Sequence, residues 1–220
     1  MNQQIETGLG YVPRFELNPN LVVNPRIEMF QKYVVPYLPE QFEMKQGKRM
    51  LPSVEIVGGG TRSAYESLAI IRALGPSHVY SIELNKERVH KAKERWHGLM
   101  RRMPGEISGI ATFVRSAAPR GIKKDQDLTV ALNINPTLIT DETFEALVAA
   151  TKVGGLIVIT NWHDSDRSKF LKVLSDRSSV LRNIEIVVNG EGLLDKNGQL
   201  IKDENQNMVD RYIWVFRKIK

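Results

Sequence analysis

Three consecutive glycines, Gly58, Gly59 and Gly60, follow a short apolar run, and Glu83 ends a second apolar run roughly twenty residues later. Glycine can take positive φ and lets a ligand approach the backbone, while a helix starting after the turn points its free N–H groups at the same place. A carboxylate in the place of Glu83 can accept hydrogen bonds from both hydroxyls of a ribose. The pattern predicts a site for an adenosine-like ligand. The alternative is a strand–helix–strand unit whose glycines only turn the chain and whose Glu83 is solvated.

Asn133 and Asn135 stand at the end of another apolar run, residues 127–134, and Pro136 follows them. In open α/β sheets, catalytic groups lie beyond the carboxyl ends of the strands, in the crevice where the strand order reverses. Both asparagines are therefore candidates for a catalytic role. The alternative is structural, since Asn-Pro is a common way to start a turn.

His163 is the best candidate for a general base. It follows the apolar run at residues 156–160 and stands beside Asp164. Imidazole titrates near neutrality, and a neighbouring carboxylate can orient it. The alternative is an exposed helix start, capped by Asp164 or Ser165.

A framework of alternating strands and helices must position these residues. Runs rich in β-branched residues predict buried strands, and apolar residues at helical spacing predict the helices between them. We expect strands at about residues 54–57, 78–84, 110–114, 127–134, 156–160, 184–188 and 209–217, and helices at about 61–74, 86–103 and 165–176 with a further one capped by Thr140. The last two strands are joined without a helix and should be antiparallel.

The helix at about residues 86–103 should bury a single apolar stripe. Its members are Val89, Ala92, Trp96, Leu99 and Met103. His90 and His97 lie on the same helix without a carboxylate partner at useful spacing, so we interpret them as surface or half-buried residues and not as ligands.

The N-terminal part predicts an irregular arm over residues 1–24, followed by a helix. Asn24 can cap that helix and Pro25 suits its first position, while Pro36 should bend or end it. We expect residues 1–50 to form an N-terminal arm and helix that packs on a main domain of residues 51–220.

The succession of an acid, a glycine-rich turn and a second acid resembles the first two motifs of the class I methyltransferases that use S-adenosylmethionine. In this sequence the first motif corresponds to Glu55 with the three glycines, and the second to Glu83. Gly154 and Gly155 should form a turn immediately before the strand at 156–160, and this Gly-Gly turn resembles the family's glycine pair at that place. Ser63 occupies the third-glycine place of the dinucleotide pattern, which disfavours a nicotinamide-dependent oxidoreductase.

This resemblance implies a Rossmann-like, doubly wound α/β sheet of seven strands in the order 3-2-1-4-5-7-6, with an antiparallel last strand and an N-terminal helical extension that could cap the substrate. It implies S-adenosylmethionine as cofactor. The implied cofactor-binding residues are Glu55, Gly58, Gly59, Gly60, Glu83, Ser116 and Asn133, and the implied catalytic residues are Asn133, Asn135 and His163. Ser116 stands where many members bond the adenine amine, and Asn135 with Pro136 matches part of the motif with which amino-methylating members hold the target nitrogen.

Composition excludes several classes of protein. The chain has no cysteine, so it has neither disulfides nor thiolate metal sites, and we expect no metal. No apolar stretch approaches the roughly 20 residues that span a bilayer, and the N-terminus lacks a signal pattern. We therefore expect a cytoplasmic protein without a membrane partner.

The formal charge of +6 is modest, with basic patches at residues 45–49, 101–102 and 120–124. This balance favours a methyltransferase that acts on a small molecule or a peptide. One alternative is an RNA or DNA methyltransferase, which requires basic patches on the side of the carboxyl strand ends. The other is a non-catalytic Rossmann-like binding or scaffold protein. The acceptor atom and the oligomeric state are not specified by the sequence.

Overall fold

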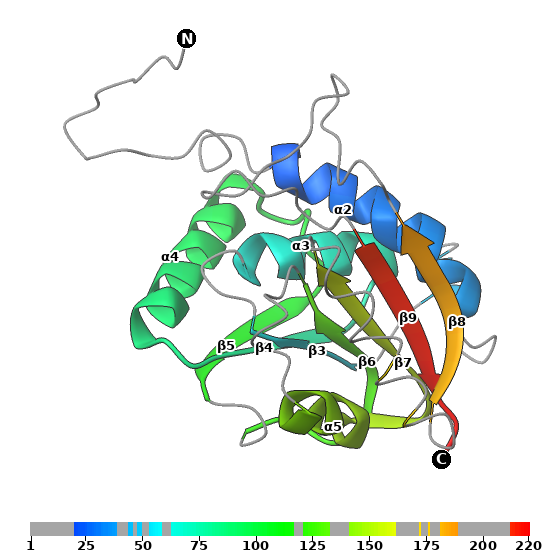
Figure 1. Cartoon of the computed structure of the whole chain (residues 1–220). Coiled ribbons are helices and arrows are strands. Elements are labelled where there is room, and N and C mark those ends of the chain that lie inside the picture. The colour runs from blue at the N-terminus through cyan, green and yellow to red at the C-terminus, as the bar shows by residue number, and fades with distance from the viewer. Residues whose placement is uncertain are drawn as a thin grey trace, which may run out of the picture.

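The protein is built around one mixed β-sheet (Figure 1). The computed structural model describes residues 20–38, 44–45, 48–49, 53–58, 63–116, 121–132, 141–161, 172, 176, 181–188 and 212–220. The strands are β1 (Met44–Lys45), β2 (Lys48–Arg49), β3 (Ser53–Val57), β4 (His78–Glu83), β5 (Ile110–Arg115), β6 (Gln126–Ala131), β7 (Thr151–Asn161), β8 (Leu181–Val188) and β9 (Tyr212–Lys218). The helices are α2 (Asn20–Tyr33), the 3-10 turn η1 (Val35–Tyr37), α3 (Ser63–Leu74), α4 (Lys86–Arg102) and α5 (Asp141–Ala150).

The sheet has seven strands in the order β5-β4-β3-β6-β7-β9-β8, and β1 and β2 form a separate hairpin. β3, β4, β5, β6 and β7 are parallel to one another, whereas β9 runs antiparallel between β7 and β8. Numbered from β3 onward, this is the predicted order 3-2-1-4-5-7-6. The fold class and the antiparallel ending are therefore confirmed.

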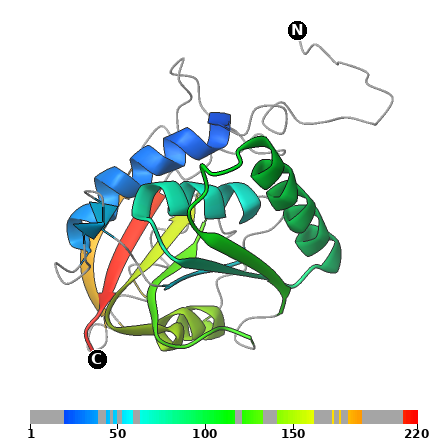
Figure 2. The ribbon, with the colours of Figure 1, turned by 180° about the vertical axis from the view of Figure 1, so that it is seen from behind.

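Helices cover both faces of the sheet (Figures 1 and 2). One apolar core lies between the sheet and the layer of α2, α3 and α4, and a second lies between the sheet and α5. Because side chains alternate along a strand, Val54 and Ile56 of β3 join the first core and Val57 joins the second. The described helices include none that is long and apolar enough to cross a membrane.

The N-terminal helix differs from the prediction at its start. α2 begins at Asn20, so Pro25 lies inside the helix and not at its first position. Pro25 is the sixth residue of the helix, beyond the first turn, so α2 lacks the hydrogen bond that an N–H at this place would donate to the carbonyl four residues earlier. The added turn buries Val23 completely. Packing of this apolar side chain overrides the local signal.

α2 packs on α3, as expected for a helix that joins the main domain. Phe30 and Val34 are fully buried in the first core. Arg26 of α2 also forms a buried ion pair with Glu66 of α3, with Nη1 and Oε1 3.0 Å apart. The contact is both apolar and ionic.

The strand predicted at residues 156–160 is longer than expected. β7 starts at Thr151, and its pairing with β6 shifts register between Gln126 and Leu128. Gly154, with φ of 82°, lies in this irregularity, and a Cβ on Gly155 would come within 3.0 Å of the Asp127 carbonyl oxygen. The glycine pair thus forms a bulge inside the strand and not a turn before it, because two backbones meet there at a distance that only glycine allows.

Candidate functional site

Three strand ends are joined by backbone hydrogen bonds at the carboxyl edge of the sheet. The Gly58 N–H donates to the Ile82 carbonyl at 3.0 Å, and the Ser116 N–H donates to the Glu83 carbonyl at 3.1 Å. These bonds connect the ends of β3, β4 and β5. Gly58, Glu83 and Ser116, all predicted cofactor-binding residues, are thereby brought into one row.

Gly58 has the backbone that its turn requires. Its φ is 70°, in the left-handed region that favours glycine, and a Cβ placed on it would meet nothing within 4 Å. The backbone is therefore open on that side within the described structure. This is the arrangement that lets a ligand approach the main chain.

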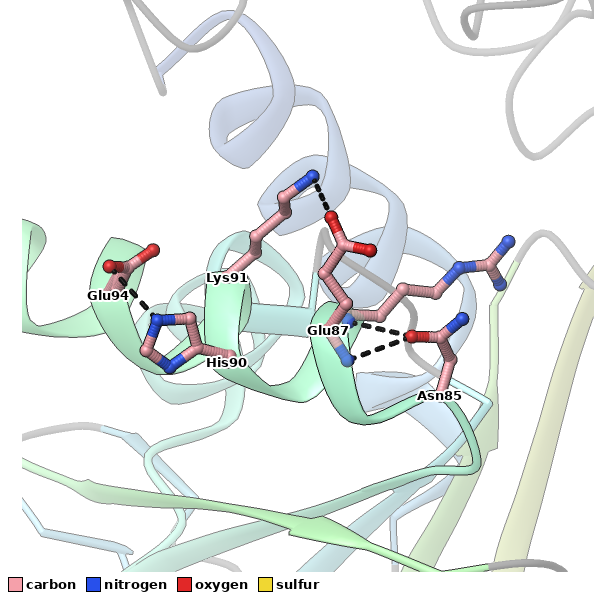
Figure 3. Close-up of polar contacts among 6 residues, drawn as sticks. Asn85, Glu87, His90, Lys91 and Glu94 are labelled. Atoms are coloured by element: carbon pink, nitrogen blue, oxygen red, sulfur yellow. Dashed lines mark hydrogen bonds and ion pairs between the residues drawn. The ribbon is translucent and has the colours of Figure 1, made fainter.

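Glu83 is oriented by the start of α4. Its Oε1 accepts a hydrogen bond from the Asn85 N–H at 2.9 Å. Asn85 caps α4, because its Oδ1 accepts from the N–H groups of Glu87 and Arg88 at 2.9 and 3.1 Å (Figure 3). A carboxylate next to the N-terminal end of a helix is favoured by the helix dipole. The Glu83 side chain is therefore fixed where β4 passes into α4.

Ser116 is packed against the segment that leads to β6. A Cβ on Gly121 would lie 2.0 Å from the Ser116 Oγ and 2.7 Å from its Cβ. Gly121 also has φ of 83°, so glycine is required there by conformation as well as by space. The position of the serine hydroxyl depends on this close contact.

Glu55 lies apart from this row, two residues before the end of β3. Its side chain is fully buried, and its Oε2 accepts a hydrogen bond from the Lys123 N–H at 2.9 Å. Oε1 has no hydrogen-bond partner within the described structure. Burial raises the pKa of Glu55 from 4.5 to about 7, although the Lys123 N–H lowers it. Its predicted cofactor contact stays a prediction.

Lys123 was not singled out by the sequence, where it is one member of a basic patch. Its Nζ lies 4.0 Å from the centre of the Tyr80 ring, and its N–H bonds Glu55. Tyr80 and Glu55 are register partners on adjacent strands. Lys123 therefore holds residues 121–125, just before β6, against β3 through Glu55 and against β4 through Tyr80, and no local pattern signals such a contact.

The interpretation of His90 needs one correction. Its Nε2 lies 3.3 Å from Oε1 of Glu94, so a carboxylate partner at useful spacing does exist, one helical turn away (Figure 3). The pair is exposed, with side-chain exposure of 71% and 64%. The interpretation of His90 as a surface residue and not a ligand remains unchanged.

The other predicted site residues lie outside the described residues. These are Gly59, Gly60, Asn133, Asn135 and His163. Their predicted roles in cofactor binding and catalysis stay predictions.

The structure is similar to several solved methyltransferases. A precorrin-6y C5,15-methyltransferase from Geobacter metallireducens has a TM-score of 0.52 and 14% identity, covering 86% of this chain and 85% of its own. An rRNA methylase from Streptococcus thermophilus has a TM-score of 0.50 and 13% identity, covering 84% and 93%. A SAM-dependent O-methyltransferase from Thermotoga maritima has a TM-score of 0.51 and 18% identity, covering 81% and 62%.

The chain has the class I methyltransferase fold. No protein-family model matches the sequence, and the comparison with curated proteins finds no match either. At identities of 13–18% the likeness extends to the fold alone. Function must therefore be argued from this chain's own residues.

The row at the carboxyl edge suits an adenosyl group. Gly58 leaves its backbone open, and a carboxylate such as Glu83 can accept from two vicinal hydroxyls. The Ser116 hydroxyl can accept or donate a hydrogen bond at the third strand end. In the class I methyltransferase fold this edge is also where the strand order reverses, between β3 and β6.

Proposed function

We propose that the protein is an S-adenosylmethionine-dependent methyltransferase that transfers a methyl group to a nitrogen or oxygen nucleophile by in-line attack. The observation that carries this proposal is the row of Gly58, Glu83 and Ser116, joined by backbone hydrogen bonds at the carboxyl edge of a class I methyltransferase fold. An open glycine backbone and a strand-end carboxylate side by side match an adenosine ligand. A scaffold protein has no need of this combination.

The cofactor supplies a methyl group already activated on a sulfonium, so the protein has mainly to place the acceptor. Correct placement of two reactants accounts for much of the rate of such reactions. Gly58 and Glu83 would bind the adenosine part, with Ser116 beside the adenine. Asn133, Asn135 and His163 are proposed to orient the acceptor, with His163 as the general base where the acceptor carries a proton.

The acceptor class is not fixed by the fold. The solved methyltransferases named above include one for precorrin-6y and one for rRNA. A small molecule or a peptide was favoured by the modest net charge of the whole chain, but net charge does not show where the charges lie. Their positions on the surface bear directly on the acceptor.

Calorimetric titration with S-adenosylhomocysteine tests the proposal, with NAD as the control ligand. We expect micromolar binding of the thioether and none of NAD. Glu83→Ala should weaken binding by about 1.5–3 kcal/mol, the usual value for a hydrogen bond to a charged group.

Two glycine variants provide a matched control. Gly58 and Gly105 both have positive φ and open space where a Cβ would lie, so Gly58→Ala and Gly105→Ala carry similar backbone strain. Gly105 follows the C-terminal end of α4, away from the proposed cofactor site. Only Gly58→Ala should weaken the binding of S-adenosylhomocysteine. Absence of binding to the wild-type protein would exclude the methyltransferase and favour the scaffold alternative.

A further inference from the structure

α4 carries most of the net charge of the protein. Its seventeen residues include seven Lys or Arg and two Glu, a formal charge of +5, against +6 for the whole chain. Most of these charged side chains are exposed. The modest net charge of the whole chain is therefore concentrated on one strongly basic helix, and the rest of the chain is nearly neutral.

Five of the basic or imidazole side chains form a row along one side of α4. They are Lys86, His90, Lys93, His97 and Arg101, spaced by four, three, four and four residues, and all five are exposed. At about 100° per residue, these spacings keep the side chains within a narrow strip of the helix surface. We call this strip the basic row.

The basic row faces away from the neighbouring helix. The apolar stripe of α4, with Val89 and Trp96, is buried against the sheet. On one side of this stripe, Arg95 lies over the ring of Tyr65 of α3, with its Cζ 5.9 Å from the ring centre. Since about 180° separates Arg95 from the middle of the basic row, the row lies on the opposite flank, beyond the packed helices.

Little of the row is neutralised by acids. Glu87 pairs with Lys91, which is not in the row, and Glu94 pairs with His90. Lys86, Lys93 and Arg101 form no ion pair within the described part of the chain. Three full positive charges are thus presented to solvent along a single line.

We propose that the basic row binds the phosphate backbone of single-stranded RNA and that this RNA carries the methyl acceptor, an inference on substrate class that rests on the proposed methyltransferase function. Arg101 lies fifteen positions after Lys86, so the row is roughly 22 Å long at a rise of about 1.5 Å per residue. At about 3.4 Å of rise per nucleotide, that length matches about six phosphates of a stacked strand.

The row leads to the proposed methyl-transfer site. Lys86 is the first residue of α4 and follows Glu83 by three positions. The N–H of Asn85, between them, donates to the Glu83 carboxylate. A strand lying on the row therefore ends beside the carboxyl edge of the sheet. Arg101 lies at the other end of α4, far from that edge. The basic row therefore also determines the direction in which a bound strand runs toward the methyl-transfer site.

Other polyanions suit the surface less well. A basic helix binds a membrane surface by inserting its apolar side, but the apolar side of α4 is buried in the core. A base inside duplex DNA must first be unstacked and flipped, whereas an unpaired RNA segment exposes its bases at lower cost. Phosphate contacts of this kind position the strand without reading its sequence.

The test is fluorescence anisotropy of a labelled single-stranded RNA 20-mer, titrated with protein over a range of salt concentrations. The variant is Lys86→Ala/Lys93→Ala/Arg101→Ala. Each lost phosphate contact changes the slope of log affinity against log salt by about 0.7 for a single strand. We expect the slope to flatten by about 2 and the affinity near 0.1 M salt to fall by roughly 100-fold.

The control variant is Lys32→Ala/Lys124→Ala/Lys220→Ala, which removes the same charge from exposed positions outside α4. It should change RNA affinity by less than about threefold. Equal losses in both variants, or no loss in the row variant, would overturn the inference. Binding to phosphatidylserine vesicles without binding to RNA would overturn it too, in favour of a membrane surface.

Titration with S-adenosylhomocysteine separates this inference from the proposed function. Both triple variants should bind the thioether as the wild type does, because none of the substituted residues belongs to the proposed cofactor site. If the row variant loses RNA affinity while neither the wild type nor the variants bind the thioether, the RNA surface is established and methyl transfer is not. If thioether binding is intact and RNA binding does not depend on the basic row, the proposed function stands and the inference that the basic row holds an RNA acceptor is overturned.

Discussion

The buried carboxyl of Glu55 makes the stability of the protein dependent on pH. Burial in β3 raises the pKa of Glu55 from 4.5 to about 7, and the hydrogen bond from the Lys123 N–H limits the rise. The substitution Glu55→Gln keeps the shape of the side chain and an acceptor for Lys123, but removes the titrating proton. We expect it to abolish this part of the pH dependence.

The sign and the size of this pH dependence follow from the proton that Glu55 binds. Between pH 4.5 and about 7 the folded protein keeps a proton on Glu55 that the unfolded chain has lost. The stabilisation is therefore complete below the lower value and is lost as the pH rises through the upper one. At about 1.36 kcal/mol per pH unit, the full window amounts to about 3 kcal/mol, most of which falls between pH 5 and pH 8.

Urea denaturation at several pH values measures the effect. Trp96 and Trp214 are buried, so their fluorescence should report unfolding. The quantity to compare is the change in unfolding free energy between pH 5 and pH 8, since any constant cost of glutamine cancels. Relative to Glu55→Gln, the wild type should lose roughly 2–3 kcal/mol of unfolding free energy over this range.

Glu87→Gln serves as the control. Glu87 is an exposed carboxylate whose pKa is lowered by its hydrogen bond to Lys91, so any effect of its titration has the opposite sign. Parallel stability curves for the wild type and Glu55→Gln would refute the reasoning. They would mean that the carboxyl is hydrated, or that a cation compensates its charge.

Two further substitutions test the packing around the site and the N-terminal helix. Gly121→Ala should displace Ser116, weaken S-adenosylhomocysteine binding in calorimetry and destabilise the fold by more than Gly105→Ala, which carries only the backbone strain of about 1–2 kcal/mol. In urea denaturation, Arg26→Met should cost about 3–5 kcal/mol by leaving Glu66 charged and buried, and the double substitution Arg26→Met/Glu66→Met should restore most of that loss.

The parallel strands and the helices between them could be predicted from the sequence, because local and tertiary preferences agree there. The buried strand β7 contains a continuous apolar run at residues 156–159, and the helices between the strands carry regular apolar stripes, as α4 does. Two boundaries were wrong where these preferences conflict. Pro25 signals a helix start, but burial of Val23 extends α2 beyond it, and Gly154 signals a turn, but pairing with β6 continues β7 through a bulge.

The site was predictable in part for the same reason. Gly58 and Glu83 stand at strand ends, where the residue type itself indicates the role, and the structure brings them together with Ser116. The contacts of Lys123 with Glu55 and Tyr80 join residues far apart in the chain, so no periodicity reveals them. They depend on how residues 121–125 pack against β3 and β4.

Two contacts hold α4 in place on the sheet, and they link the proposed methyl-transfer site to the proposed RNA surface. Trp96 of α4 packs on Phe113 of β5, with ring centres 6.1 Å apart, and Asn85 ties the helix start to the Glu83 carboxylate. The basic row therefore cannot shift along the sheet independently of the carboxyl edge. If the row holds the phosphates of an RNA, the distance from those phosphates to the transferred methyl group is constant. The methylated nucleotide would then be selected by its distance along the strand from the bound phosphates, which requires no contact with the bases that lie on α4.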